Sequence, residues 1–92
     1  MTNSQIIEGI ARDVYGDDAV DNMIRSGIEI PLHTAQGWNM RGSYRIRKGE
    51  HGIETKLWKK KVAKELDDEG TNQGFYLAKS YLFTSMQVEK AD

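Results

Sequence analysis

The chain contains no cysteine, a single proline and two histidines. Without thiolates it can form neither a disulfide nor a cysteine-ligated zinc site, and a cysteine nucleophile is excluded. His33 and His51 alone do not complete a structural zinc site of ordinary composition. No nucleophile-elbow pattern marks a catalytic serine. We therefore expect neither a metal nor another cofactor.

Long apolar runs are also missing. No stretch of 18 apolar residues occurs, and the N-terminus lacks the basic segment and apolar core of a signal peptide. We expect no membrane span, no membrane partner and a cytoplasmic location. With 92 residues, 38% of them hydrophobic, the chain can build one modest core. We predict a single domain spanning residues 1–92.

One weak signal for catalysis is present. The tripeptide Glu54-Thr55-Lys56 has the Glu-x-Lys form found in many metal-dependent nucleases. Such sites also need an upstream acid to hold Mg²⁺, and the sequence has none between Glu29 and Glu50. We therefore expect the protein not to be an enzyme.

Positive charge is scarce outside one stretch. Nine of the thirteen Lys and Arg residues lie in residues 41–64, where Glu50 and Glu54 are the acids. This stretch has a net charge of +7, residues 1–30 and 65–92 each have −4, and the total is −1. A basic stripe suits a polyanion, because each cation near a phosphate releases condensed counterions. Solvated strand faces are also often basic, so the charge alone leaves an ordinary surface open.

Residues 1–30 predict two helices. Apolar residues recur at helical spacing from Ile7 to Val14, which indicates a helix from about Ser4 to Tyr15 that Thr2 or Ser4 can cap.

The second helix starts after Gly16 and ends at Gly27, with Val20, Met23 and Ile24 facing inward. The apolar faces of both helices are typical of a core, so we assign these helices a structural role.

An extended connector over residues 28–32 carries the proline. A short third helix follows, with Thr34 as its cap, Ala35 and Trp38 on one face and Gly42 as its end.

Beyond Gly42 the apolar period changes to two. Residues 44–47 and 53–58 alternate on either side of a turn at residues 48–52, which predicts a hairpin with one buried face. The buried side chains are Ile46, Ile53 and Leu57. Alternation places on the other face Arg45, Arg47, Glu54, Lys56 and Trp58.

The last third of the chain predicts a mobile loop at residues 60–74, a central strand at residues 75–83 packed on both faces, and a final turn of helix at residues 86–90. The whole is an α+β domain in which N-terminal helices, residues 1–30, pack on a small three-stranded antiparallel sheet.

An aromatic ring among cations is the layout of a single-strand binder, where bases stack on exposed rings and cations follow the backbone. Trp58 would stack a base if exposed, or belong to the core if a helix covers it. Lys48 is the cation most expected to meet a phosphate, Glu50 orders the turn, and Gly49 and Gly52 permit unusual backbone angles. The candidate nucleic-acid-binding residues are Arg41, Tyr44, Arg45, Arg47, Lys48, His51, Lys56, Trp58 and Lys60.

Four motifs carry a resemblance to a known family: Ala35-Gln36-Gly37-Trp38, the stretch Gly-Ser-Tyr-Arg-Ile-Arg-Lys-Gly-Glu-His-Gly-Ile at residues 42–53, Leu57-Trp58, and Leu-Phe-Thr-Ser-Met-Gln-Val-Glu at residues 82–89. Over roughly residues 30 to 90 the chain resembles the N-terminal domain of the ArdC antirestriction proteins. The resemblance implies a single-stranded-DNA-binding domain of a plasmid, phage or other mobile element, which shields incoming DNA from restriction in a bacterial host cell.

The chain departs from that family at three points. It lacks the metalloprotease-like domain with a His-Glu-x-x-His helix, so no protease activity carries over. Thr84 and Met86 stand where the closing motif of the family has an acid and a serine, and His51 replaces the second lysine of its turn. Imidazole titrates near pH 6.5, so the turn loses one phosphate-directed charge at neutral pH.

A small protein-binding inhibitor of a host defence or replication protein is the alternative, because charge asymmetry also steers proteins together. The two functions predict different surfaces. A DNA binder exposes Trp58, or Tyr44 or Tyr76, beside cations such as Arg45, Arg47 and Lys56. An inhibitor exposes a contiguous apolar patch or a strongly acidic one.

Overall fold

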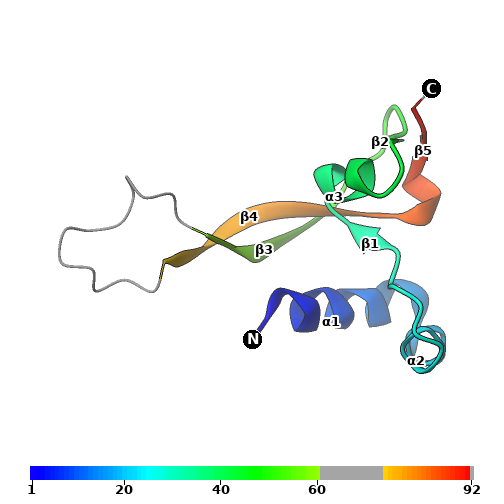
Figure 1. Cartoon of the computed structure of the whole chain (residues 1–92), viewed down its shortest axis with the longest axis vertical. Helices are drawn as coiled ribbons and strands as arrows, with labels where there is room; N and C mark the ends of the chain where they lie inside the picture. Colours follow the sequence, from blue (N-terminus) through cyan, green and yellow to red (C-terminus); the bar gives the residue numbers. More distant parts are fainter. Residues whose placement is uncertain (61–73, 92) are drawn as a thin grey trace.

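The computed structural model describes residues 1–60 and 74–91. Figure 1 shows the order of its elements along the chain. They are α1 (Asn3–Tyr15), α2 (Asp17–Arg25), β1 (Leu32–His33), α3 (Ala35–Met40), β2 (Tyr44–Ile46), β3 (Ile53–Lys60), β4 (Phe75–Thr84), the 3-10 helix η2 (Ser85–Gln87) and β5 (Val88–Lys90). The predicted α+β class is confirmed. The loop predicted at residues 60–74 lies, for residues 61–73, outside the described residues.

Two small antiparallel sheets organise the strands. The first has three strands in the order β1-β4-β3, and the second pairs β2 with β5. Helices α1 and α2 lie on one side of the first sheet, whereas α3 and the β2–β5 pair lie on the other side at one end (Figure 1). The prediction of helices packed on a three-stranded antiparallel sheet is therefore confirmed.

The predicted hairpin between residues 44–47 and 53–58 is wrong. Strand β3 pairs with β4 from Ile53↔Leu82 to Lys60↔Phe75, and β2 pairs with β5. The ten residues of β4 give β3 a full-length partner, which the three residues of β2 do not. Residues 47–52 instead cross from one sheet to the other.

Gln87 holds this crossover in place. Its backbone carbonyl accepts from the Arg47 N–H at 2.8 Å. Its side-chain Nε2 donates to the His51 carbonyl at 2.8 Å and to Glu50 Oε1 at 3.1 Å. Glu50 therefore orders the turn, as its sequence position indicated.

The C-terminal segment differs from its prediction as well. A helical turn was expected at residues 86–90, but η2 ends at Gln87 and is followed by strand β5. Thr84 and Gln87 form a capping box around the 3-10 turn, and Val88 then lies opposite Ile46 in the β2–β5 pair. Pairing with β2 therefore draws these last residues into a strand.

The helix signals read from the sequence are confirmed. Thr2 caps α1, and its hydroxyl forms a capping box with Gln5. Thr34 caps α3 by accepting from the Gly37 N–H at 3.1 Å. Arg12 joins α1 to α2 through Asp21 at 2.8 Å and Asp17 at 3.2 Å.

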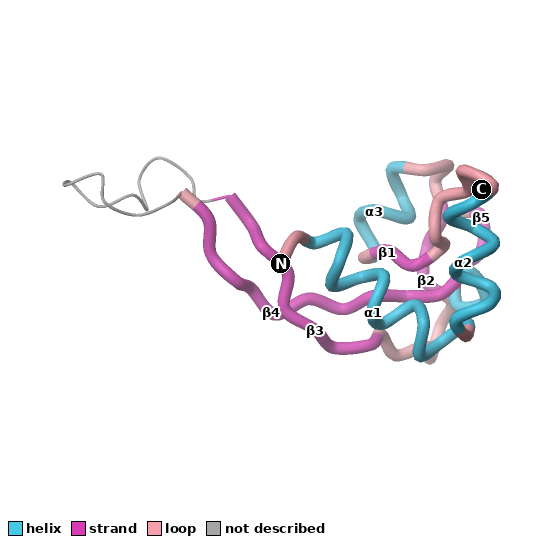
Figure 2. The backbone as a smooth tube through the Cα atoms, turned by 90° about the horizontal axis from the view of Figure 1, so that it is seen from below, coloured by secondary structure: helices cyan, strands magenta, loops and turns pink. Residues whose placement is uncertain are grey.

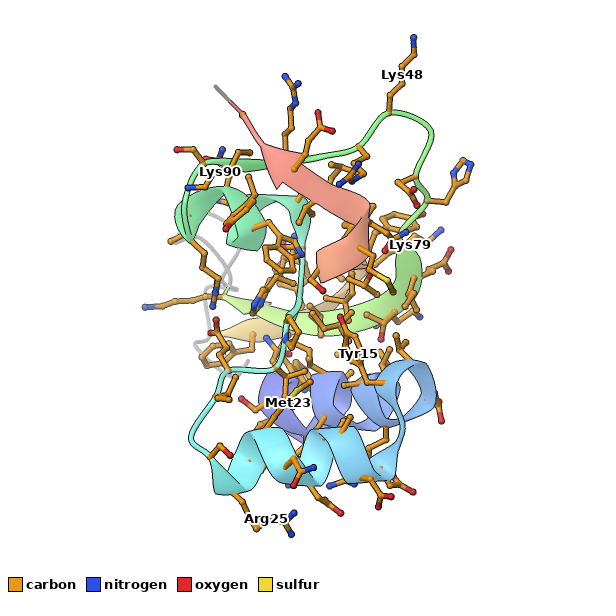
Figure 3. All side chains as sticks on the ribbon, turned by 90° about the vertical axis from the view of Figure 1, so that its right-hand side faces the viewer. Tyr15, Met23, Arg25, Lys48, Lys79 and Lys90 are labelled. Carbon is orange, nitrogen blue, oxygen red and sulfur yellow. The ribbon has the colours of Figure 1, made fainter. Side chains whose placement is uncertain are left out.

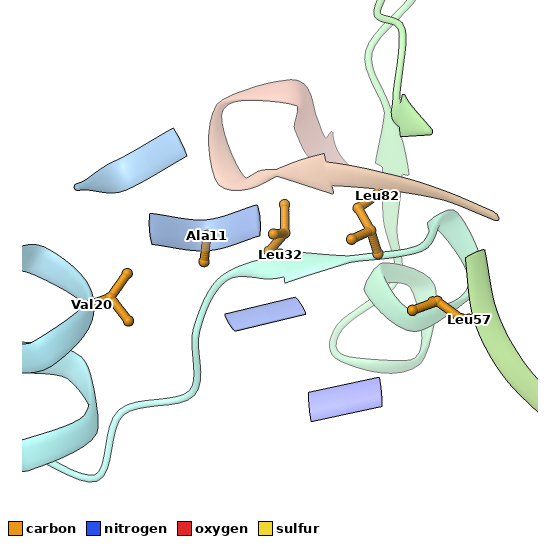
Figure 4. Close-up of a cluster of buried hydrophobic side chains, with 5 residues drawn as sticks. All are labelled: Ala11, Val20, Leu32, Leu57 and Leu82. Carbon is orange, nitrogen blue, oxygen red and sulfur yellow. The ribbon is translucent and has the colours of Figure 1, made fainter. Parts of the chain in front are cut away.

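The core lies between α1, α2 and the first sheet (Figure 4). Its buried residues are Ala11, Val20, Leu32, Leu57 and Leu82. Burying a leucine side chain contributes about 1.5–3 kcal/mol, so these contacts fix the helices on the sheet. Ile24 was expected to face inward but is 49% exposed, because α2 reaches the core through Val20.

Strand β4 is central, as predicted, but it is not packed on both faces along its whole length. Leu82 and Thr84 are buried, whereas Phe75, Tyr76 and Leu77 are exposed. The reason is that the β3–β4 hairpin extends past the helices, which both Figure 1 and Figure 2 show.

Gly52 is required for a close approach of the crossover to the sheet. A Cβ at this position would lie 2.7 Å from Tyr81 Cβ and 2.8 Å from Phe83 Cζ. The unusual backbone angle that was expected at both turn glycines is found at Gly49, with φ 88°, but not at Gly52.

The mutation Gly52→Ala should therefore lower the free energy of unfolding by about 1–3 kcal/mol through overpacking. Gly9→Ala is the matched control, because Gly9 lies within α1 and an added Cβ has nothing within 4 Å. That control should gain about 0.5–1 kcal/mol from helix propensity. Urea denaturation measures both, and equal stability of the Gly52→Ala variant and the wild type would contradict the close approach.

Candidate nucleic-acid interface

The β3–β4 hairpin is an antiparallel ribbon with two different faces. Alternation sends Ile53, Thr55 and Leu57 toward α1, opposite Leu82, Ser80 and Ala78. Between residues 54–60 and 75–81, the alternate side chains point away from α1 and α2. We call them the outer face, made up of Glu54, Lys56, Trp58 and Lys60 from β3 and Phe75, Leu77, Lys79 and Tyr81 from β4.

The outer face combines exposed apolar groups with cations. Trp58, Phe75, Leu77 and Tyr81 are 40%, 52%, 47% and 45% exposed. The three lysines are exposed too, and Glu54 is the acid on this face. Lys56 lies directly opposite Lys79 in the β-ladder, and like charges in that position repel. Aromatic faces beside uncompensated cations can stack bases and attract phosphates.

The N-terminal residues hold Trp58 in a fixed position. The side-chain amide of Asn3 forms the two hydrogen bonds that the backbone of a neighbouring strand would form. Its Oδ1 accepts from the Trp58 N–H at 2.7 Å, and its Nδ2 donates to the Trp58 carbonyl at 3.0 Å. The indole Nε1 donates to the Met1 carbonyl at 2.8 Å. The N–H group of the ring therefore has a hydrogen-bond partner, while the ring itself stays part-exposed. Of the two alternatives for Trp58, the structure has the exposed ring and not the one covered by a helix.

A hollow of about 550 Å³ lies next to this ring. It is lined by Met1, Thr2, Asn3, Trp58 and Phe75. Its walls are therefore two aromatic rings and the start of the chain, a shape and chemistry that suit a flat apolar group.

The crossover turn borders the outer face. Gly52 lies against Tyr81 and Phe83, so Lys48 and His51 are close in sequence to one end of that face. Lys48 points away from the body of the protein (Figure 3), and His51 is exposed. Arg47 uses its Nε to donate to the Val88 carbonyl at 3.3 Å.

Three other candidate residues, Arg41, Arg45 and Tyr44, lie elsewhere and have structural partners. Arg41 binds the Glu29 carboxylate through Nε at 2.7 Å and Nη2 at 2.8 Å. Arg45 pairs with Glu89 across the second sheet, at 2.9 Å from Nη2 to Oε2. The structure therefore separates these two cations from the outer face.

Tyr44 is half-buried in a small aromatic cluster. Its ring meets the Trp38 ring edge-on at 5.6 Å, and Lys90 Nζ lies 5.1 Å from its centroid. Trp38 in turn donates its Nε1 to the Phe83 carbonyl at 2.8 Å. The tryptophan of the short helix therefore anchors α3 on β4.

Sequence reasoning missed half of the outer face. Phe75, Leu77, Lys79 and Tyr81 come from β4, and each matters only once β4 is known to be the partner of β3. The alternation of residues 75–83 was the available signal, but the near-continuous apolar run was interpreted as burial on both faces.

Glu29, Arg41 and His33 form a cluster of ionisable side chains beside the aromatic cluster. The Arg41 hydrogen bonds lower the pKa of Glu29 and raise the pKa of Arg41. Burial lowers the pKa of His33, the Arg41 charge lowers it further, and Glu29, 3.4 Å from His33 Nε2, partly opposes this. The fold therefore favours the neutral imidazole.

Comparisons with protein-family models, with curated proteins and with solved structures found no match. Within residues 1–60 and 74–91, no cluster of three or more His, Asp or Glu side chains is placed to hold a metal ion. In the same part of the chain, no helix has the length and apolarity needed to cross a membrane.

The pKa of His33 can be tested by NMR titration of its ring protons. We expect a midpoint below the ordinary value of 6.5. Because the folded pKa is depressed, the stability contribution is complete above about pH 6.5 and is lost as the pH falls through the folded pKa. Arg41→Gln removes the nearby cation and should raise the His33 midpoint. An unchanged or lower midpoint in that variant would contradict the assigned cause.

Proposed function

We propose that this domain binds single-stranded DNA without strong base preference, through the outer face of the β3–β4 ribbon. The observation that carries the proposal is the placement of exposed aromatic rings beside lysines that have no acidic partner within residues 1–60 and 74–91. Trp58 and Leu77 lie opposite each other, next to the facing pair Lys56 and Lys79.

Stacking provides the first part of the argument. Bases contribute about 1–3 kcal/mol each when they stack on exposed rings. Trp58 is held by Met1 and Asn3, so little conformational freedom is lost when a base covers it. Bases in a duplex have their faces covered, which gives the outer face a preference for single strands.

Charge provides the second part. Lys56 and Lys79 face each other across the ribbon, and in the described part of the chain no ion pair involves Lys56, Lys60 or Lys79. A phosphate between the two facing lysines would turn their repulsion into attraction. Binding of a polyanion therefore relieves an unfavourable feature of the free protein.

The resemblance to the ArdC N-terminal domain supports the same ligand. The Lys48–Gly52 turn that carries the most specific part of the resemblance borders the outer face. We propose the corresponding setting, protection of mobile-element or phage DNA from restriction in the bacterial cytoplasm.

A protein-binding inhibitor is the second candidate, and the exposure of Phe75, Leu77 and Trp58 favours it. These apolar groups suit a protein partner as well as bases. The lysines between them suit an anionic ligand better, because charged residues are depleted at the centre of protein interfaces.

Fluorescence anisotropy with a labelled oligo(dT) tests the proposal. We expect salt-sensitive binding that is tighter than to a duplex of the same length. Lys56→Gln with Lys79→Gln should weaken it and reduce the salt slope by about 1.4, at roughly 0.7 for each contact with a single strand. Trp58→Leu should weaken binding, making its free energy less favourable by about 1–3 kcal/mol.

The matched control is Arg25→Gln with Lys90→Gln. It removes the same charge from α2 and β5, away from the outer face. Equal losses in the two double variants would show that net charge alone acts, and the absence of binding at low salt would refute the proposal in favour of a protein partner.

A further inference from the structure

Among the described strands, none pairs with one edge of the central strand β4 along most of its length. Strand β1 covers only the positions Leu32↔Thr84 and His33↔Phe83, after which the chain turns into α3. Within the described residues, no strand lies beside residues 75–82 of β4 on that side. Figure 1 shows β1 near the C-terminal end of β4.

The open edge presents regular hydrogen-bonding groups. The backbone N–H and C=O of Trp58 point away from β4, since both bind Asn3. In an antiparallel pair, the opposite residue Leu77 then points its own groups away from β3. The same orientation recurs at every second residue, at Lys79 and Tyr81, and Phe83 confirms it by accepting from Trp38.

A groove of about 590 Å³ borders this edge and extends to Asn3 and Trp58 on the β3 side. Its lining includes residues 34–36 at the start of α3 and Lys79 and Tyr81 from the edge itself. Leu57 adds an apolar surface and Lys59 a second cation. Among the described residues that line it, the charged ones are Lys59 and Lys79, so the groove is cationic.

We propose that the β4 edge binds an extended acidic peptide segment as an added strand, in line with β1 and antiparallel to β4. Strand addition satisfies the outward N–H and C=O groups of Leu77, Lys79 and Tyr81. The peptide's side chains alternate, so that carboxylates lie beside Lys79 while apolar side chains enter the groove near Leu57.

The chemistry of the edge favours a peptide over other occupants. A second copy paired about Lys79 would place two Lys79 side chains opposite each other, which is repulsive. A nucleic acid would satisfy the lysines, but the outward carbonyls of the edge would face its phosphates. An acidic peptide matches the donors, the acceptors and the charge.

The probe is a heptapeptide, blocked at both ends, in which glutamate alternates with valine. In ¹⁵N–¹H spectra, its addition should shift the amide protons of Leu77, Lys79 and Tyr81 downfield and slow their exchange at least tenfold. The amides of Ala78 and Ser80 face β3 and should keep their exchange rates. The same peptide with lysine in place of glutamate should bind at least tenfold more weakly.

Two substitutions at one site separate the backbone from the charge. Lys79→Ala removes the charge and keeps the outward N–H. Lys79→Pro removes both, without breaking the hydrogen bonds between β4 and β3. The proline variant should therefore bind the peptide at least fivefold more weakly than the alanine variant. Lys56→Pro places the proline on the opposite edge and should bind like Lys56→Ala, which loses the same charge. Protection of the wild-type amides is a readout that does not depend on the folding of any variant.

Four results would overturn the proposal. They are equal binding by Lys79→Ala and Lys79→Pro, no protection of the wild-type edge amides at millimolar peptide, protection that appears with rising protein concentration alone, and equal protection of those amides by oligo(dT) in the absence of peptide. The third would assign the edge to a second copy and the fourth to nucleic acid. If the wild-type protein binds the peptide but does not bind DNA, the proposed function is refuted and the peptide proposal stands.

Discussion

The pairing of β3 with β4 is the constraint on which the rest of the structure depends. Its register, from Ile53↔Leu82 to Lys60↔Phe75, places Leu57 and Leu82 under the helices and sends Trp58 and Lys79 to the outer face. Because side chains alternate with a period of two, a slip of one residue would exchange the two faces. The core and the candidate binding surface are therefore two consequences of a single register.

The two sides of the sheet serve different purposes. On one side, α1 and α2 bury a core of small and aliphatic residues and are linked to each other by Arg12. On the other side, α3 and the β2–β5 pair cover the end of the ribbon through Trp38, and the rest is left exposed. Concentrating the packing at one end leaves the hairpin free to present its rings and lysines, and the Asn3–Trp58 hydrogen bonds order that exposed part.

Local features were readable from the sequence, and long-range pairings were not. The Thr2 and Thr34 caps and the inward Val20 follow from spacing over a few residues, and the structure has them. The partner of β3 lies beyond a long connection, and sequence alternation does not identify it. That missing partner explains why Lys79 was overlooked and Arg45 was placed beside Trp58.

Leucine-methyl NMR during titration with oligo(dT) tests the central claim most directly, because the two faces carry different leucines. Leu77 lies on the outer face, whereas Leu32, Leu57 and Leu82 are buried in the core. We expect the Leu77 methyl signals to shift strongly while those of the three core leucines stay nearly unchanged. Shifts at Leu57 and Leu82 without a shift at Leu77 would contradict the assignment of DNA binding to the outer face.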